Sequence, residues 1–423
     1  MPTASVRMPQ QTARYQEKRE AILDAAARLF NEQGVKGATL AGIAGSVGLV
    51  TNSVTYYYRK KEDLATACFQ RAIEVFDGLA CAAASSPDVP ARVADFVRRY
   101  AQRLADMEDG RQPVIVNFND IRALPSPQAE QVFAAYTDMF RHVRALLKGP
   151  QTAHLGREDL NARAHVLLST LHTMRAWIVH YEADEYHRVA DRVADLLLRG
   201  WAAGGARWQA EDGERDWRLG PALAGPSEAF LRAATLLVNE QGYRGASIDR
   251  ISARLNVTKG SFYHHHDNKQ DLISACFERS FAVVRQALQL AEDSAGSGWS
   301  RACAAGRALV RFQLSDDGPL LRATATSALP DAAHREWVRL MTHRLTERMA
   351  NVVVDGMMDG SIRPLDPSIA AQGAIGAINA AAEMHRWVAS ATLDSVADLY
   401  VRPAFEGLLC AGAALDSAHP TSA

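Results

Sequence analysis

The sequence predicts an all-α protein that consists of two copies of one helical unit, and three observations support this fold class. Residues 19–71 align without a gap with residues 227–279, and 21 of the 53 aligned positions are identical, which indicates an internal duplication. Apolar residues recur every three or four positions, as in residues 20–30, which is typical of a helix with one buried face. Strand-like alternation of β-branched residues is nearly absent, and prolines divide each copy into segments of ordinary helix length.

The duplication extends beyond this segment with small shifts, so that Val193-Ala194-Asp195-Leu196 corresponds to Val396-Ala397-Asp398-Leu399. Each unit is therefore about 205 residues long. The intervening residues 213–226 are rich in Gly and Pro, which break helices and favour a linker. We expect each copy to end in two bundle-forming helices, at residues 158–181 and 186–209 in the first copy and 367–389 and 393–412 in the second.

Composition excludes several classes of protein. The chain has 423 residues with 47 Lys and Arg against 48 Asp and Glu, for a net charge of −1. A histone-like polycation is excluded, so nucleic-acid binding would need a local basic patch. No apolar run is long enough to span a membrane, and residues 1–16 lack the apolar core of a signal peptide. Five scattered cysteines without CxxC spacing favour a cytoplasmic protein with neither zinc nor disulfides.

The front of each unit has the turn chemistry of a helix-turn-helix. Gly34 is expected to close the first helix in the left-handed conformation, Thr39 to cap a short second helix, and Gly48 to form the turn before a third helix that starts with small polar residues. The second copy has Gly242, Ser247 and Asn256 at these positions. Two short helices joined by a tight turn, the second polar at its start, are typical of DNA-reading domains.

Copy two continues Asn256-Val257-Thr258-Lys259-Gly260-Ser261-Phe262-Tyr263, and both copies contain Asn-Glu-Gln-Gly-x-x-Gly-Ala followed by Thr or Ser. These stretches resemble the TetR family of bacterial transcriptional regulators, specifically over residues 19–76 and 227–284. The resemblance implies two tandem TetR-like units, each a helix-turn-helix three-helix domain followed by a helical effector and dimerisation domain. The expected parts are an N-terminal basic arm (1–18), DNA-binding domain 1 (19–78), effector domain 1 (79–212), the linker (213–226), DNA-binding domain 2 (227–284), effector domain 2 (285–415) and a tail (416–423).

The resemblance also implies which residues contact DNA. In the family the third helix enters the major groove, where Asn pairs with adenine, Lys with guanine, and methyl groups meet the thymine methyl. The residues matched to base or phosphate contacts are Thr39, Val50, Thr51, Asn52, Ser53, Tyr56, Tyr57 and Lys61 in copy one, and Ser247, Thr258, Lys259, Gly260, Ser261, Tyr263, His264 and Lys269 in copy two. Thr39 and Ser247 would bind phosphate at a helix N-terminus.

Copy one departs from the family pattern. Thr55 stands where the family has its tyrosine, so either Tyr56 or Tyr57 is the phosphate ligand, while Tyr58 matches a core aromatic. Its second helix holds Gly42 and Gly45, and each glycine destabilises a helix by about 0.8–1 kcal/mol. The leading hypothesis is that both domains bind DNA with different base preferences. The alternative is that one has decayed into a scaffold or partner-binding module.

Other motifs favour simpler interpretations. The run His264-His265-His266 is not a metal site, because successive residues of a helix point about 100° apart. Cys68 and Cys276 occupy equivalent positions and fit a buried apolar role. No GxSxG, HExxH, P-loop or dinucleotide fingerprint is present, so the chain is predicted to be no enzyme and to use no cofactor.

The rear of each unit is expected to bind a small organic effector and to dimerise. The candidate pocket residues, each of which also fits plain core, are Phe118, Phe140, His172, Arg175, Trp177, Phe312, Trp337, Met341, Met384 and Trp387. Copy one can pair with copy two inside one chain at high effective concentration. We therefore expect an intramolecular pseudo-dimer, with further homodimerisation left open. It is expected to act as a repressor that binds an asymmetric or imperfectly palindromic operator and releases it when the effector binds.

Overall fold

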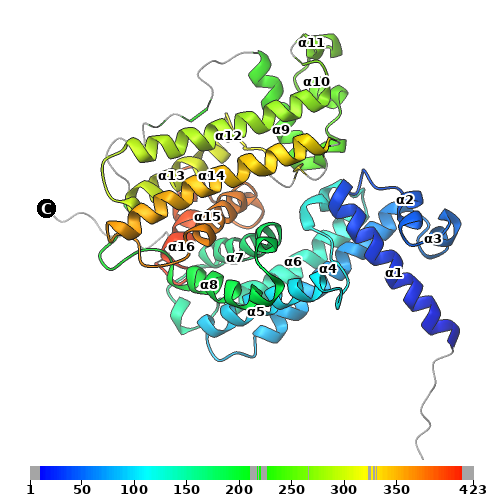
Figure 1. Ribbon diagram of the computed structural model, residues 1–423, viewed down its shortest axis with the longest axis horizontal. Helices are drawn as coiled ribbons and strands as arrows, with labels where there is room; N and C mark the ends of the chain where they lie inside the picture. The colour runs from blue at the N-terminus through cyan, green and yellow to red at the C-terminus, as the bar shows by residue number, and fades with distance from the viewer. Residues whose placement is uncertain are drawn as a thin grey trace, which may run out of the picture.

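The computed structural model describes residues 10–209, 217, 219–220, 226–264, 266–322, 325–326, 329 and 331–411. Within them the architecture is all-α, and the β-structure consists of one isolated bridge between Ala202 and Ile362. The two units lie side by side, the first in blue to green and the second in green to red (Figure 1). No helix among these residues is both long enough and apolar enough to cross a membrane.

The first unit begins with a three-helix head and continues into a helical body. The head comprises α1, α2, α3 and the start of α4, and we call it head 1. The elements of the unit are α1 (Gln10–Gln33), α2 (Leu40–Ser46), α3 (Thr51–Tyr57), α4 (Lys61–Ala83), α5 (Val89–Glu108), η1 (Phe118–Ala123), α6 (Gln128–Leu146), η2 (Pro150–Thr152), α7 (Arg157–Trp177), η3 (Ile178–His180), η4 (Ala183–Glu185) and α8 (Tyr186–Arg199).

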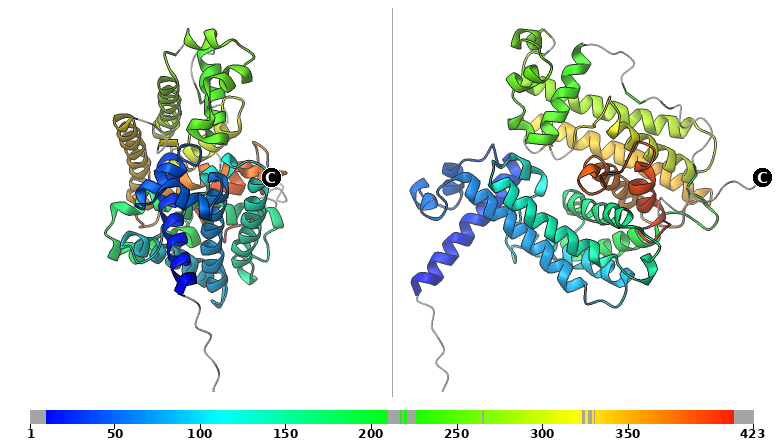
Figure 2. Two further views of the ribbon diagram at one scale, coloured as in Figure 1. Left: turned by 90° about the vertical axis from the view of Figure 1, so that its right-hand side faces the viewer. Right: turned by 180° about the vertical axis from the view of Figure 1, so that it is seen from behind.

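The second unit repeats this order, and its head, which we call head 2, comprises α9, α10, α11 and the start of α12. The elements are α9 (Pro226–Gly245), α10 (Ile248–Arg254), α11 (Lys259–Tyr263), α12 (Lys269–Asp293), α13 (Gly298–Leu314), α14 (Ala332–Met358), α15 (Pro367–Ala381), η7 (Met384–Arg386), the π-helical η8 (Ala397–Val401) and α16 (Arg402–Glu406). Both heads lie toward the same side of the molecule, which faces the viewer in the left panel of Figure 2.

Several predicted boundaries differ from the structure. The expected arm is helical from Gln10, where α1 begins, and α4 and α12 run without a break across the expected head–body boundaries at residues 78 and 284. The helix predicted at 186–209 ends at Arg199, because Gly200 takes a φ of 63°. The pair predicted at 367–389 and 393–412 is divided into α15, η7, η8 and α16. The tail and most of the linker lie outside the described residues.

The two units pack against each other through the ends of their bodies, which forms the predicted pseudo-dimer within one chain. Helix α7 packs along α15, and the Ser169 hydroxyl donates a hydrogen bond to the Gly376 carbonyl at 2.7 Å. The Trp201 ring stacks on Phe405 with centroids 4.0 Å apart. One buried apolar core runs through the first unit and the C-terminal helices of the second, whereas head 2 has a core of its own.

A buried arginine strengthens this interface. The Arg163 side chain of α7 is fully buried, and its guanidinium donates to the carbonyls of Leu408 at 3.0 Å and Cys410 at 3.1 Å. It also pairs with Asp159 at 3.3 Å within α7. A buried charge is tolerated only where such partners surround it, so these contacts hold the end of the second unit against the first.

Candidate nucleic-acid interface

The turns of both heads have the backbone geometry predicted from their residue types. Gly34 follows the end of α1 with a φ of 71°, Gly242 breaks α9 near its end with a φ of 73°, and Gly48 has a φ of 66°. Asn256, at the position of Gly48, also has a positive φ of 54°, which Asn tolerates better than most residues. These four conformations confirm the helix-turn-helix plan of the two copies.

The predicted N-caps are also present. The Thr39 hydroxyl accepts a hydrogen bond from the Gly42 N–H at 3.0 Å, and the Ser247 hydroxyl accepts one from the Arg250 N–H at 3.3 Å. Each hydroxyl keeps its own proton for a further acceptor. A phosphate oxygen is one acceptor that fits this position, because the first backbone N–H groups of a helix also point there.

Helix α3 presents one face to solvent and buries the other. Val50 is 68% exposed and Tyr56 76% exposed, whereas Val54 is fully buried. Asn52 is exposed, and Thr51 and Ser53 are half-buried. Tyr58 is buried, in agreement with its predicted core role. The side chains expected to face bases therefore belong to the accessible side of the helix.

An aromatic cluster beside α3 was not predicted. Tyr15, on the N-terminal extension of α1, has its ring centroid 4.7 Å from that of Tyr57 and 6.3 Å from that of Tyr56. Tyr57 is half-buried by these contacts, so Tyr56 is the more accessible of the two candidate phosphate ligands. The sequence predicts only a basic arm over residues 1–18, and no local pattern indicates that Tyr15 lies near the third helix.

The recognition helix of head 2 carries different groups. Thr258, Lys259 and Gly260 are exposed, and Tyr263 is 51% exposed. The Lys259 ammonium pairs with the Asp249 carboxylate of α10 at 3.0 Å, which raises the pKa of the lysine. His264 is also exposed, and Ser261 lies within α11. Lys259, the residue that suits guanine, is therefore held at the surface of head 2 by the exposed Asp249 carboxylate.

The lysines at the start of α4 and α12 have structural partners. Lys61 donates to the Ala38 carbonyl at 3.0 Å and to the Lys36 carbonyl at 3.4 Å, which ties α4 to the turn before α2. The Lys269 ammonium lies 4.1 Å from the centre of the Tyr243 ring. A phosphate contact by either residue would add to these contacts or replace them.

Equivalent asparagines tie each head to its body. In the first unit the Asn31 amide donates to the Ile115 carbonyl at 2.9 Å and its oxygen accepts from the Asn117 N–H at 2.8 Å. In the second unit Asn239 donates to the Leu320 carbonyl at 2.9 Å and accepts from the Arg322 N–H at 3.1 Å. The first helix of each head is thus fixed to the loop that follows the fifth helix of its unit.

The candidate pocket residues of the first unit are closely packed. The Phe118 ring lies 5.1 Å from the His172 ring, and Phe140 stacks on Trp387 of the second unit at 3.5 Å. Arg175 donates to the Ile115 carbonyl at 2.7 Å. Trp177 lines a cavity of about 20 Å³, which holds about one water molecule.

The structure separates the remaining candidates into two places. Phe312 lies beneath the Arg279 guanidinium at 5.5 Å, and Trp337 packs on Phe281 at 5.6 Å with Met341 nearby. Met384 is buried beside the first unit, in the same core as Trp387. Phe140 and His172 therefore share one aromatic core with Trp387, whereas Phe312, Trp337 and Met341 belong to the second unit alone.

Two histidines in this shared core are unprotonated at neutral pH. Burial lowers the pKa of His165 and of His172 to about 4. The His165 Nδ1 lies 3.3 Å from the Tyr400 hydroxyl, whereas the buried His172 Nε2 has no hydrogen-bond partner. An unpartnered buried nitrogen is unfavourable, and among the described candidates of this core both His172 and Trp177, through its Nε1, have one.

Two equivalent cysteines are buried, and one surface cluster brings together three potential metal ligands. Cys68 and Cys276 are fully buried, and burial raises the pKa of each thiol to about 12. Asp77, Cys81 and His142 bring three potential metal ligands within 4.8 Å of one another at the surface, a grouping that was not predicted. The His142 Nδ1 lies 2.6 Å from the Asp77 carboxylate, so this pair is already satisfied by a hydrogen bond.

Comparison with known proteins assigns the heads. The family "Bacterial regulatory proteins, tetR family" matches residues 22–68 and again residues 230–276. The TetC protein of transposon Tn10 from Escherichia coli is 38% identical over 73 residues, which are 17% of this chain and 36% of TetC. The HTH-type transcriptional regulator YhgD of Bacillus subtilis is 22% identical over 142 residues, 34% of this chain and 74% of YhgD. This chain thus spans about a third of the length of TetC.

Two solved structures of lower sequence identity each cover less than half of this chain. A TetR-family regulator from Bordetella parapertussis is 20% identical with a TM-score of 0.38, and the match covers 43% of this chain and 94% of that one. AibR in complex with isovaleryl coenzyme A and operator DNA is 22% identical with a TM-score of 0.35, covering 43% and 98%. The two separate family matches, with the duplicated turns and caps, lead to one conclusion: the chain consists of two tandem TetR-like units, each of which begins with a helix-turn-helix domain of the tetR family of bacterial regulatory proteins.

Proposed function

We propose that this protein is a transcriptional regulator whose two unlike heads bind one operator. The observation that carries the proposal is the presence of two family-matched heads in a single chain that already forms its own pseudo-dimer. A homodimer reads a palindrome because its two heads are identical. Here the exposed recognition positions hold Asn52 in one head and Lys259 in the other, so the preferred half-sites differ.

The chemistry of each recognition helix supports a different preference. The Asn52 amide has the donor and acceptor geometry for adenine, and Val50 offers methyl groups to thymine. The Lys259 ammonium is a donor that suits the acceptors of guanine, and Gly260 leaves room for close approach of the backbone. The other matched positions, such as Thr39 and Ser247, serve as phosphate contacts that set orientation without reading sequence.

The regulatory step in this proposal is a change in the distance between the heads. In each unit one asparagine of the head, Asn31 or Asn239, makes two hydrogen bonds to the body. A small organic effector that prefers one arrangement of the bodies would shift the heads relative to the operator. His172, with its unused nitrogen in the aromatic core, supports an effector site in the first body. Repression as the sign of regulation is supported by the Staphylococcus epidermidis protein IcaR, a negative transcriptional regulator that is 40% identical over 48 residues, 26% of its length.

The alternative of a decayed head is less well supported. Both heads match the family, and both have an intact cap before the second helix. Helix α2 forms with both Gly42 and Gly45 in it, and the Thr39 hydroxyl caps it by accepting from the Gly42 N–H. We therefore favour two working heads.

Selection of random-sequence DNA by the purified chain, followed by sequencing, tests this function. The expected result is one enriched site with two unlike half-sites at a fixed spacing. Enrichment of a single half-site would support the decayed-head alternative. No enriched sequence, with binding only at low salt, would overturn the proposal, because backbone contacts alone give salt-sensitive binding without sequence preference.

A further inference from the structure

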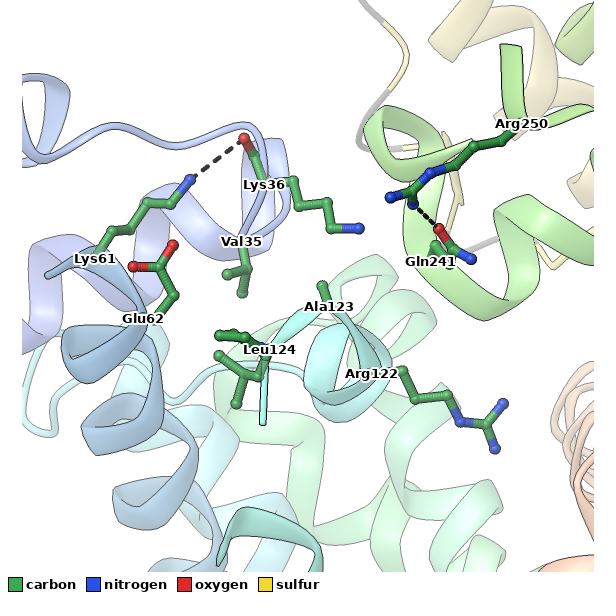
Figure 3. Close-up of a pocket in the computed structure, with 10 residues that line it drawn as sticks. Val35, Lys36, Lys61, Glu62, Arg122, Ala123, Leu124, Gln241 and Arg250 are labelled. Atoms are coloured by element: carbon green, nitrogen blue, oxygen red, sulfur yellow. Dashed lines mark hydrogen bonds between the residues drawn. The ribbon is translucent and has the colours of Figure 1, made fainter. Parts of the chain in front are cut away.

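A cleft lies between the two heads, at a place that neither unit forms alone. It has a volume of about 490 Å³, within the range of small-molecule sites. Its walls come from the turn after α1, the start of α4, η1 and the segment after it, and head 2 (Figure 3). The lining residues on which the argument depends are Lys36, Lys61, Arg122, Leu124, Gln241 and Arg250.

The cleft carries an excess of positive charge. Four of its residues are cationic, namely Lys36, Lys61, Arg122 and Arg250, against one lining acid, Glu62. Arg122 is partly neutralised by Glu383 at 3.5 Å. Among the residues that the structure describes, no carboxylate lies within 4.0 Å of the side-chain nitrogens of Lys36, Lys61 or Arg250.

Two of these cations belong to different heads and approach each other. Lys36 extends from head 1 toward Arg250 and Gln241 of head 2 (Figure 3). Burial and the nearby Arg250 guanidinium both lower the pKa of Lys36, although Asp120 opposes the effect. Like charges in a partly desolvated site repel each other. An anion between them would replace that repulsion with two attractive contacts.

The other side of the cleft is apolar. Val35, Ala123, Leu124 and Pro125 line it next to the cations; Val35 and Leu124 are largely buried, Ala123 is half-buried, and Pro125 is exposed. Inorganic phosphate alone would leave this surface unused, whereas a phosphate ester with a small apolar group would cover it. Guanidinium and ammonium groups are the side chains that proteins use for phosphate oxygens.

We propose that this cleft binds a small organic phosphate ester whose phosphate group lies between Lys36 and Arg250 and whose apolar part lies against Leu124. The bound ester contacts both heads, so it holds them at one separation. The binding itself is independent of the function proposed above, and only its consequence for operator affinity rests on that function.

Isothermal titration calorimetry of the full chain with phenyl phosphate tests the site. The expected result is one phenyl phosphate per chain, weaker binding of inorganic phosphate, and no binding of phenol. We expect the Lys36→Ala and Arg250→Ala substitutions each to weaken the binding of phenyl phosphate at least tenfold. The matched control is Lys148→Ala, an exposed lysine of the first body, which should bind as the native chain does.

Two further measurements keep the test decisive. Circular dichroism of each variant shows that it is folded, and Lys36→Arg, which retains the charge, should retain binding to within a few fold. Equal affinity in the native, Lys36→Ala and Arg250→Ala proteins, or several equivalent ions per chain, would overturn the proposal.

A DNA duplex is the other source of phosphate. If duplex DNA and phenyl phosphate bind together, the small-molecule site is supported, and if duplex DNA displaces phenyl phosphate, the cleft serves the DNA backbone and the proposal fails.

Discussion

Gly200 and Gly407 meet where the two units cross, and each leaves room for the backbone of the other. A Cβ atom on Gly200 would lie 2.6 Å from the Gly407 nitrogen, and one on Gly407 would lie 3.1 Å from the Gly200 nitrogen. Both residues have positive φ, 63° and 95°. Gly200 follows α8 and Gly407 follows α16, the last helix of each unit, so each unit supplies one half of this contact.

Gly200→Ala and Gly407→Ala should therefore each destabilise the pseudo-dimer. We expect a loss of about 2–4 kcal/mol in the free energy of unfolding, because backbone strain and a backbone clash combine. Urea denaturation measures it. Gly78→Ala is the control, since Gly78 lies in α4 with open space around its Cβ, and it should be stabilising by about 0.5–1 kcal/mol. Similar effects at all three sites would contradict the role of this crossing.

Each recognition helix should contribute independently to DNA binding. Asn52→Ala and Lys259→Ala each remove a base-reading group, and a good base contact contributes about 1–3 kcal/mol. We expect each variant to bind the selected operator about tenfold or more weakly, measured by fluorescence anisotropy at fixed salt. Asn52→Ala should lose base preference only in the half-site bound by head 1, and Lys259→Ala only in the half-site bound by head 2. Loss with Lys259→Ala and none with Asn52→Ala would instead identify head 1 as decayed.

Glu383 should couple the two units electrostatically. It pairs with Arg322 at 2.5 Å and with Arg122 of the first unit at 3.5 Å. Although burial opposes its charged form, these guanidinium groups lower the pKa of Glu383 to about 2. Glu383→Gln is expected to lower the free energy of unfolding by about 1–3 kcal/mol, because it leaves two arginines without their partner.

Glu185→Gln supplies the comparison for Glu383. Glu185 is half-exposed and lies 4.0 Å from Arg188, and exposed pairs contribute little, about 0–1 kcal/mol. Denaturant unfolding of both variants at pH 7 measures the difference. If Glu383→Gln lowers the free energy of unfolding no more than Glu185→Gln does, the ion pairs of Glu383 with Arg122 and Arg322 do not stabilise the protein.

Stability should fall as pH drops from about 6.5 to 4. Burial lowers the pKa of His165 to about 4, below the value of about 6.5 for the unfolded chain. In this window the unfolded chain binds a proton that the folded chain excludes, so the stabilisation is complete above pH 6.5 and is lost on acidification. The limiting slope is about 1.4 kcal/mol per pH unit for one histidine.

Urea denaturation at pH 7 and pH 5 checks this dependence. His165→Gln should show a smaller loss between the two pH values than the native protein. The control is His142→Gln, which removes an exposed ring. It should lose as much stability between pH 7 and pH 5 as the native protein does. An unchanged loss in His165→Gln would show that His165 is not the group that titrates on unfolding.

Local chemistry was predictable from the sequence, and contacts between distant residues were not. The conformations of Gly34 and Asn256 follow from residue type and from spacing within one head. By contrast, the Asp120 carboxylate accepts a hydrogen bond from the Val35 N–H at 2.8 Å across 85 positions, and no local pattern indicates it. The cleft at Lys36 and Arg250 likewise depends on how two units pack. In the same way, apolar spacing marks Phe140 and Trp387 as buried but does not indicate that Phe140 of the first unit stacks on Trp387 of the second.

The most direct test of the central claim is the stoichiometry of the operator complex. Light scattering on the selected operator should give the mass of one chain per duplex, and replacing either half-site should weaken binding to a different extent. Exchanging the two half-sites for two copies of one should also weaken it. Two chains on a palindrome, with equal losses for either half-site, would contradict the account of one chain with two unlike heads.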